Sequence, residues 1–209
     1  IQEGKARGML PWAYDENGWP SGFGSGAVCA LGIDYQQKYL RMTEEEPPEN
    51  KIGKVDGVWF YYEVNPYYVD VCDKKVIQKF IEVAYEPYYK RFGNTFEGFF
   101  TDEPEAANVD IPWSLTLPDE YKREYGEDLL PILIHLFKPM GDFKKTRMRF
   151  WRLVTKLFSE SYVKQLYDWC ETHNMKLTGH LSGEVSLKSQ IPTNGACMPH
   201  YEYFHIPLI

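Results

Sequence analysis

Short apolar runs that end in acidic or polar side chains alternate along this chain with stretches of helical periodicity. The runs at residues 9–14 (MLPWAY), 98–101 (GFFT) and 175–181 (MKLTGHL) have the length of β-strands. Residues 73–92 and 142–173 lie between them and repeat apolar side chains three and four positions apart, as amphipathic helices do. Strands that alternate with helices predict a parallel sheet.

The polar residues at the strand ends favour a (β/α)8 TIM-barrel type of α/β fold over a doubly wound sheet. A doubly wound nucleotide-binding sheet carries G-x-G-x-x-G after its first strand, whereas residues 22–26 (GFGSG) lack that order and no helical pattern follows them directly. A barrel places polar side chains at the carboxyl ends of eight strands, and this chain offers only four or five. We therefore predict a single catalytic-barrel domain over residues 1–209, as an incomplete barrel or, preferably, part of the barrel of a longer protein.

A β-rich excursion from the barrel is predicted at about residues 23–66. Residues 28–33 and 58–64 (VWFYYEV) are its strand candidates. A further short strand is expected at residues 68–71, and a last one at residues 201–206 (YEYFHI).

Local signals predict where the helices begin and end. Asp73 is a suitable N-cap for the first long helix, and Pro87 should bend or end that helix early. Residues 119–137 read as mostly helical, with breaks around Gly126 and Pro131.

Composition excludes two classes of partner. The formal net charge is −7 and the charged residues are interspersed, so no basic stripe could follow a phosphate backbone, and we expect no nucleic-acid partner. No apolar run approaches the length of about 18 residues that a membrane span needs, so we expect no membrane partner. The four cysteines lie far apart without a C-x-x-C pair, which favours buried thiols over a zinc site. The chain begins at Ile1 without a methionine, so an upstream segment is expected, and a cytoplasmic or an exported location is left open.

Asp102 and Glu103 are the most prominent candidates for chemistry. They follow an apolar strand directly, and Pro104 comes next. Adjacent like charges repel, so stability alone does not favour the pair, and a catalytic or metal-binding role would explain it. The structural alternative is that Asp102 pairs with a buried arginine or caps the following segment.

Other strand ends carry further candidates. His180 and Glu184 lie in residues 178–184 (TGHLSGE), where two glycines allow close backbone approach. The alternative for His180 is a core residue whose hydrogen bonds are satisfied, and the alternative for Glu184 is a solvated loop residue. Aromatic rings make up 16% of the chain, and such rings stack on the C–H face of a sugar. The remaining candidates for a sugar site are Trp12, Tyr14, Asp15, Glu16 and Trp19 around the first strand end and Tyr201, Tyr203 and His205, which would share one face of the last strand. For Asp15 and Glu16 a simple turn is the alternative.

Carboxylates at separate strand ends indicate glycoside hydrolysis. That reaction needs one carboxyl group to protonate the leaving oxygen and a second to act as nucleophile or to activate water. Asp102 and Glu103 should not fill both roles, because successive strand residues point to opposite faces. The natural pair is therefore Glu103 and Glu184, whose acid and base roles the sequence leaves open.

Several strings together resemble a known family. They are WAYDENGWPSG (12–22), FFTDEPE (99–105), YKREYGEDLLPIL (121–133), LTGHLSGE (177–184) and YEYFHIP (201–207). In this order, over nearly the whole chain, they are similar to the α-L-rhamnosidase-like glycoside hydrolases.

The resemblance implies a (β/α)8 catalytic domain with flanking β-rich domains in the full protein, and inverting hydrolysis of terminal α-L-rhamnosides of an oligosaccharide or other glycoside. It implies Glu103 and Glu184 as acid and base, without assigning which is which. It implies a pocket formed by Trp12, Tyr14, Asp15, Glu16, Asp102, His180 and His205. Calcium assistance is also implied, with Asp15 and Asp102 as possible oxygen ligands; no organic cofactor is expected.

Two other functions fit the same residues. A non-catalytic carbohydrate-binding or degenerate barrel domain would keep the aromatic platform without turnover. A metal-dependent hydrolase could use His180, His205 and Asp102 around a transition metal, although nothing in their spacing indicates such a site.

Overall fold

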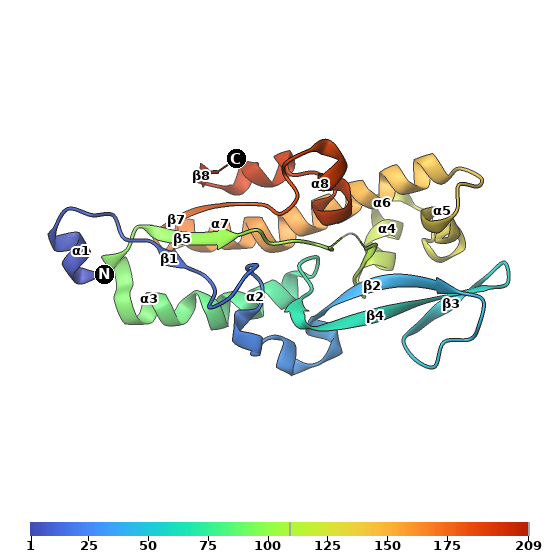
Figure 1. Ribbon diagram of the computed structural model, residues 1–209, viewed down its shortest axis with the longest axis horizontal. Helices are drawn as coiled ribbons and strands as arrows, with labels where there is room; N and C mark the ends of the chain where they lie inside the picture. The colour runs from blue at the N-terminus through green and yellow to red at the C-terminus, as the bar shows by residue number, and fades with distance from the viewer. Residues whose placement is uncertain (109, 209) are drawn as a thin grey trace.

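The parallel sheet predicted from the alternating pattern is present in the computed structural model, which describes residues 1–108 and 110–208. Its strands are β1 (Ala13–Tyr14), β5 (Gly98–Asp102), β7 (Lys176–His180) and β8 (Ile206–Pro207), in the order β1-β5-β7-β8. Every pairing is parallel, so all carboxyl ends lie at one edge (Figure 1).

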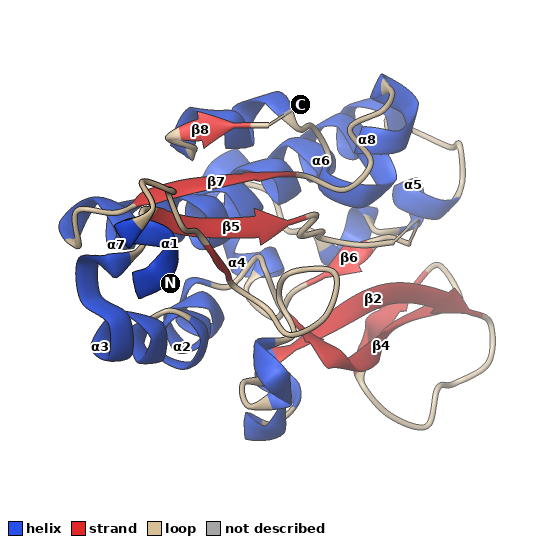
Figure 2. Cartoon of the chain, turned by 60° about the vertical axis from the view of Figure 1, so that its left-hand side comes forward, coloured by secondary structure: helices blue, strands red, loops and turns tan. Residues whose placement is uncertain are grey.

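Helices cover one face of this sheet (Figure 2). They are α2 (Lys74–Ala84), α3 (Glu86–Phe92), α6 (Phe143–Phe158) and α7 (Lys164–Thr172). Phe99 points into this layer, where its ring stacks on Tyr85 at 4.1 Å between centroids and meets the edge of Trp169 at 5.7 Å. Because strand residues alternate between faces, Phe100 and Thr178 point the other way, and they line a surface hollow there.

Of the predicted (β/α)8 barrel, only the α/β fold class is confirmed. The fold is mixed α/β, but within residues 1–108 and 110–208 the parallel sheet has four strands and does not close. Closing a barrel needs further strands that pair with both edges of the sheet. What the chain supplies is an open sheet with helices packed on one side.

The second sheet is antiparallel and lies beside the first (Figure 1). Its order is β3-β4-β2-β6, with β2 (Gln36–Thr43), β3 (Lys51–Val55), β4 (Val58–Val69) and β6 (Pro112–Trp113). The strand predicted at residues 58–64 is part of β4. Of the separate strand expected at residues 68–71, only residues 68 and 69 are in a strand, as the end of β4. The strand predicted at residues 28–33 is wrong, because Gly32, at φ 117°, separates two 3₁₀ turns, Cys29–Leu31 and Ile33–Tyr35.

The local helix signals are confirmed. Asp73 accepts a hydrogen bond from Lys75 N at 2.8 Å and caps α2. Pro87 lies in the first turn of α3, where its missing N–H needs no partner, and α2 ends before it. Gly126 ends α4 (Leu117–Tyr125) in the left-handed conformation. The long helix predicted at residues 142–173 runs through α6, a π-turn at Ser159–Val163, and α7.

The strand predicted at residues 201–206 is mostly wrong. A 3₁₀ helix, Met198–Tyr203, occupies its first half, and only Ile206–Pro207 pairs as β8. Tyr201, Tyr203 and His205 therefore do not share a strand face. The other helical elements are α1 (Gln2–Ala6), α5 (Ile134–Phe137), α8 (Leu187–Asn194) and the 3₁₀ turns Gly24–Gly26, Gly93–Thr95 and Leu130–Ile132. None of the helices in the described residues has the length and apolar character that crossing a membrane requires.

Candidate active site

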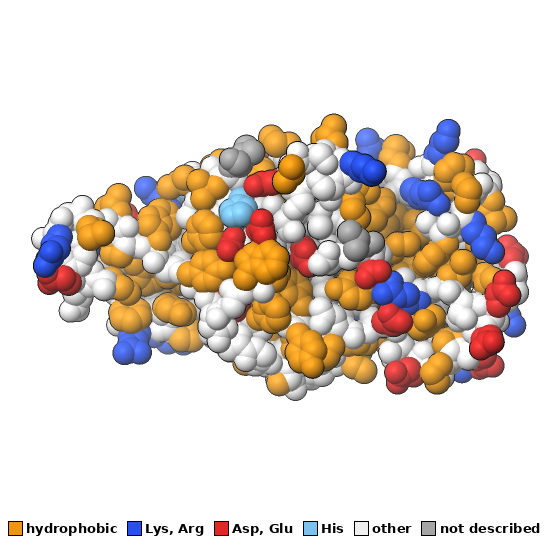
Figure 3. All heavy atoms as spheres, viewed as in Figure 1, with side chains coloured by type: hydrophobic (Ala, Val, Ile, Leu, Met, Phe, Trp, Pro, Cys, Tyr) orange, Lys and Arg blue, Asp and Glu red, His pale blue; other side chains and the backbone are white. Residues whose placement is uncertain are grey.

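Three carboxylates surround His180 at the carboxyl ends of β5 and β7. His180 Nε2 lies 3.0 Å from Asp102 Oδ1, while Nδ1 lies 3.8 Å from Glu103 Oε1 and 3.6 Å from Glu184 Oε1. All four side chains are partly open to solvent. Figure 3 shows acidic side chains gathered around a histidine on this face, with hydrophobic side chains beside them. We call these four residues the carboxylate cluster.

Strand register and one unusual backbone conformation assemble the cluster. Asp102 pairs with His180 across β5 and β7, so their side chains are neighbours on the same face. Glu103 follows the strand end with φ 50°, and its N–H donates to His180 O at 3.0 Å. The expectation that Asp102 and Glu103 point to opposite faces is therefore wrong, because the chain turns at Glu103 and both carboxylates reach His180.

Aromatic side chains donate a hydrogen bond to each carboxylate. Trp19 Nε1 donates to Glu103 Oε2 at 3.0 Å. Tyr14 OH donates to Asp102 Oδ2 at 2.9 Å, and Tyr201 OH donates to Glu184 Oε2. Burial, followed by the hydrogen bond to the neighbouring carboxylate, raises the pKa of both phenols, so they remain donors at neutral pH. These three predicted sugar-site residues thus orient the carboxylates.

The two glutamates are close enough to act on one bond. Because both Oε1 atoms lie near the same Nδ1 atom, at 3.8 Å and 3.6 Å, they can be at most 7.4 Å apart. Inverting glycosidases separate their carboxyl groups by about 6.5–9.5 Å and retaining ones by about 5–5.5 Å. The limit is compatible with either geometry.

Asp15 supports the cluster from below and does not line it. Its side chain is only 3% exposed, which corrects its assignment as a substrate-binding residue. It accepts hydrogen bonds from Ser21 Oγ at 2.5 Å and Tyr85 OH at 2.8 Å, and Ser21 Oγ in turn accepts from Asp102 N at 2.7 Å. Burial raises the pKa of Asp15 to about 7.

Glu16 is likewise a structural residue. It is 8% exposed and accepts hydrogen bonds from Gly22 N at 3.0 Å and Gly24 N at 2.6 Å. Burial raises the pKa of this carboxyl. Its predicted place in the sugar pocket is therefore also corrected, because the carboxylate holds the following loop.

His205 lies apart from the cluster. Its Nδ1 accepts from Leu177 N at 2.9 Å, so Nε2 carries the proton and donates to Glu171 Oε1 at 2.6 Å. The His205 ring stacks on the Tyr167 ring, and Tyr203 meets the Tyr167 ring edge-on. With both ring nitrogens engaged, His205 neither joins His180 in a metal site nor lines the proposed pocket.

Trp12 takes part in an aromatic floor beside the cluster. Together with Tyr14, Phe100, Thr178 and Ile206 it lines a hollow of about 500 Å³ on the face that the helices leave uncovered. Tyr14 stacks on Phe100 at 5.9 Å, and Phe100 meets the His180 ring at 6.0 Å. The floor therefore leads along the strands directly into the carboxylates.

Sequence reasoning missed Ser21 and Glu105. Ser21 is fully buried and links Asp15 to Asp102. Burial raises the pKa of the Glu105 carboxyl, a hydrogen bond with Ser182 lowers it, and nearby Glu103 raises it further. The sequence signal that could have identified Glu105 is its position two residues after Glu103, just beyond the strand.

The described residues do not offer calcium or a transition metal an evident site. No group of three or more His, Cys, Asp or Glu side chains in residues 1–108 and 110–208 is arranged to hold a metal ion. Asp15 and Asp102, the expected ligands, direct their oxygens at Ser21, Tyr85, Tyr14 and His180. These residues do not fit a calcium site, and no step below depends on one.

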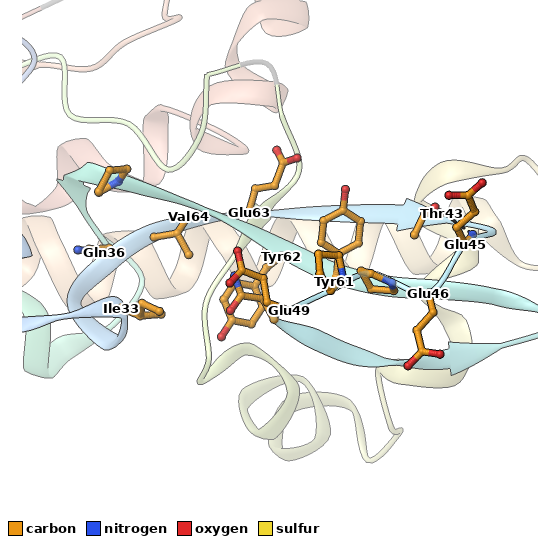
Figure 4. A pocket seen from close by; sticks show the side chains of 14 residues that line it. Ile33, Gln36, Thr43, Glu45, Glu46, Glu49, Tyr61, Tyr62, Glu63 and Val64 are labelled. Atoms are coloured by element: carbon orange, nitrogen blue, oxygen red, sulfur yellow. Dashed lines mark hydrogen bonds between the residues drawn. The ribbon is translucent and has the colours of Figure 1, made fainter.

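A separate hollow of about 590 Å³ lies on the antiparallel sheet (Figure 4). Tyr61, Tyr62 and Glu49 help to line it, and none of the cluster residues does. Two of its other acidic side chains are already paired, Glu46 with Lys51 and Glu63 with Arg41.

Comparison with known proteins gives a distant structural similarity. No known protein family matches the sequence, and no curated protein matches it. Among solved structures, the rhamnosidase from Novosphingobium sp. PP1Y is similar to this chain with 15% sequence identity and a TM-score of 0.49. The match covers 81% of this chain and 15% of that one, so the chain spans a small part of the length of that enzyme.

Proposed function

We propose that this chain carries the catalytic carboxylates of a glycoside hydrolase. The observation that carries the proposal is that Glu103 Oε1 and Glu184 Oε1 lie 3.8 Å and 3.6 Å from the same histidine nitrogen. An aromatic floor suited to a sugar ring adjoins them. Acid–base cleavage of a glycosidic bond requires two carboxyl groups that can reach the same bond.

Each residue of the cluster has a part in the proposed reaction. Glu184 donates its proton to the glycosidic oxygen as the C–O bond breaks. Glu103 takes a proton from a water molecule, whose oxygen bonds to the anomeric carbon, and the configuration there is inverted. Asp102 lies 3.0 Å from His180 Nε2 and orients the ring, so that Nδ1 lies near both glutamates.

For the substrate we propose terminal α-L-rhamnosides. The support is the ordered set of sequence strings that resembles the α-L-rhamnosidase-like glycoside hydrolases. Two of these strings contain the whole carboxylate cluster: FFTDEPE contains Asp102 and Glu103, and LTGHLSGE contains His180 and Glu184.

Replacing each glutamate by glutamine tests the reaction. With p-nitrophenyl α-L-rhamnoside, we expect Glu103→Gln to lower kcat by about 10²–10⁴-fold, the usual contribution of a positioned acid or base. Rhamnose affinity, measured by calorimetry, should change little, because the amide keeps the shape and polarity of the side chain. Glu202→Gln, at an exposed glutamate outside the cluster, is the matched control and should leave kcat unchanged.

The same assay separates the two roles. A p-nitrophenolate leaving group needs little protonation, whereas a sugar alcohol needs it strongly. Glu184→Gln should therefore lose less activity on p-nitrophenyl rhamnoside than on a rhamnosyl disaccharide. Glu103→Gln should lose activity on the two substrates by the same factor.

The non-catalytic alternative has support of its own in the aromatic floor of Trp12, Tyr14 and Phe100. A parent protein that binds rhamnosides but turns over none of them would establish that binding role and reject the hydrolase.

A further inference from the structure

Exposed aromatic side chains form a second hollow next to the carboxylate cluster. It measures about 330 Å³, and Trp19, Phe23, Pro66, Tyr67, Asn17 and Ser25 help to line it. Trp19 is 60% exposed and Tyr67 is 72% exposed, although both are large rings. No charged side chain belongs to its lining among the described residues. We call this feature the Trp19–Tyr67 hollow.

Buried contacts fix the walls of this hollow in advance. The Glu16 carboxylate holds the loop on both sides of Phe23 by accepting from Gly22 N and Gly24 N. The Phe23 ring packs edge-on against Tyr68 at 5.6 Å, and Tyr68 is itself buried. On the other side, Tyr14 OH, whose proton points to Asp102, lies 3.1 Å from Gly18 O. A wall held in this way loses little conformational entropy when a ligand binds.

Trp19 connects the hollow to the proposed reaction. The same indole ring lines the hollow and donates its N–H to Glu103 Oε2 at 3.0 Å. A ligand that reaches from the carboxylate cluster past Glu103 therefore meets the Trp19–Tyr67 hollow next. The antiparallel sheet contributes Pro66 and Tyr67 to it from β4, which gives that excursion a part in the site.

We propose that the Trp19–Tyr67 hollow binds a second sugar ring of an oligosaccharide, next to the terminal ring whose glycosidic bond is cleaved. This inference rests on the proposed glycoside hydrolysis and names the kind of substrate. Exposed aromatic faces suit the C–H face of a pyranose, the uncharged lining suits a neutral ligand, and Asn17 and Ser25 can bind hydroxyl groups. The volume lies at the small end of ligand sites, which suits one ring.

The experiment compares a one-ring and a two-ring ligand by calorimetry. The probes are methyl α-L-rhamnoside and a disaccharide of rhamnose linked to glucose. We expect Tyr67→Ala to weaken disaccharide binding by about fivefold, as loss of an aromatic contact does, and to leave binding of methyl rhamnoside unchanged. Tyr61→Ala, on the same strand but lining the hollow of Figure 4, is the matched control and should affect neither ligand.

Both titrations are made in the Glu103→Gln background, in which the disaccharide is not consumed during the measurement, so the outcome reports binding alone. A selective loss of disaccharide affinity in a protein that cleaves no glycoside would support the hollow and reject the hydrolase. Equal weakening of both ligands, no weakening of either, or no binding of the disaccharide by the parent would overturn the proposed subsite. Because Tyr67 is exposed, its replacement should not unfold the protein, and thermal unfolding checks this.

Discussion

Asp15 illustrates how a single residue can serve the site without touching a substrate. It is buried beneath the cluster and reaches the Asp102 backbone through Ser21. Because a carboxylate is costly to bury, the pKa of Asp15 is raised from 3.8 to about 7. The folded protein therefore keeps a proton there at pH values at which the unfolded chain has released it.

This shift predicts how stability depends on pH. Below about pH 4 both states hold the proton, between about pH 4 and pH 7 only the folded state does, and above about pH 7 both have lost it. The contribution of Asp15 to stability thus falls as pH rises through that window and is constant above it. From pH 5 to pH 8, the parent should lose on the order of 2 kcal/mol more unfolding free energy than Asp15→Asn.

Urea unfolding of both proteins at the two pH values measures that difference. The asparagine side chain of the variant is not ionisable, and its amide can still pair with Ser21 and Tyr85. Parallel pH profiles for parent and variant would show that Asp15 does not titrate in this way.

At the scale of the elements, the site depends on how closely β5 and β7 approach. Gly179 in β7 has φ 148°, and a Cβ atom there would lie 2.0 Å from Thr101 O in β5. Gly179→Ala should therefore separate the strands that pair Asp102 with His180. We expect a loss of more than about 3 kcal/mol in unfolding free energy, or failure to fold, because backbone atoms cannot give way as a flexible side chain can.

A second glycine supplies the control for this prediction. Gly126 also has positive φ, at 69°, but a Cβ atom there would meet nothing within 4 Å. Gly126→Ala should lose only about 1 kcal/mol from backbone strain. Similar melting temperatures for the two variants would contradict the close approach at Gly179.

Elements with a strong local signal could be predicted from the sequence, and elements defined by distant contacts could not. The α2 helix has regular apolar spacing and an Asp73 cap, so its start was predictable. The β2 strand was missed because its fully buried Lys38 looks like a surface residue. That lysine donates to Gln36 O and lies 3.7 Å from Asp70 Oδ2, a residue far along the chain. An ion pair between residues so far apart in the chain does not change the local pattern of apolar and polar residues.

At the scale of the whole molecule, the expectation that polar residues at the ends of parallel strands meet predicted the carboxylate cluster, but it did not predict how deeply each residue is buried. It brought Asp102, Glu103, His180 and Glu184 together because parallel strands end at one edge. It also included Asp15 and Glu16, which follow β1 but are covered by Tyr85 and the loop of residues 21–24. Burial depends on what packs above a strand end, and no local pattern specifies that. Closure of the sheet is equally a property of the whole fold.

The most direct test of the account is a crystal structure of Glu103→Gln with the rhamnosyl disaccharide bound. We expect the terminal ring over Tyr14 and Phe100 and the glycosidic oxygen about 2.6–3.2 Å from a Glu184 carboxyl oxygen. The second ring should lie between Trp19 and Tyr67. A disaccharide bound in the hollow of Figure 4, or anywhere out of reach of Glu184, would contradict the account.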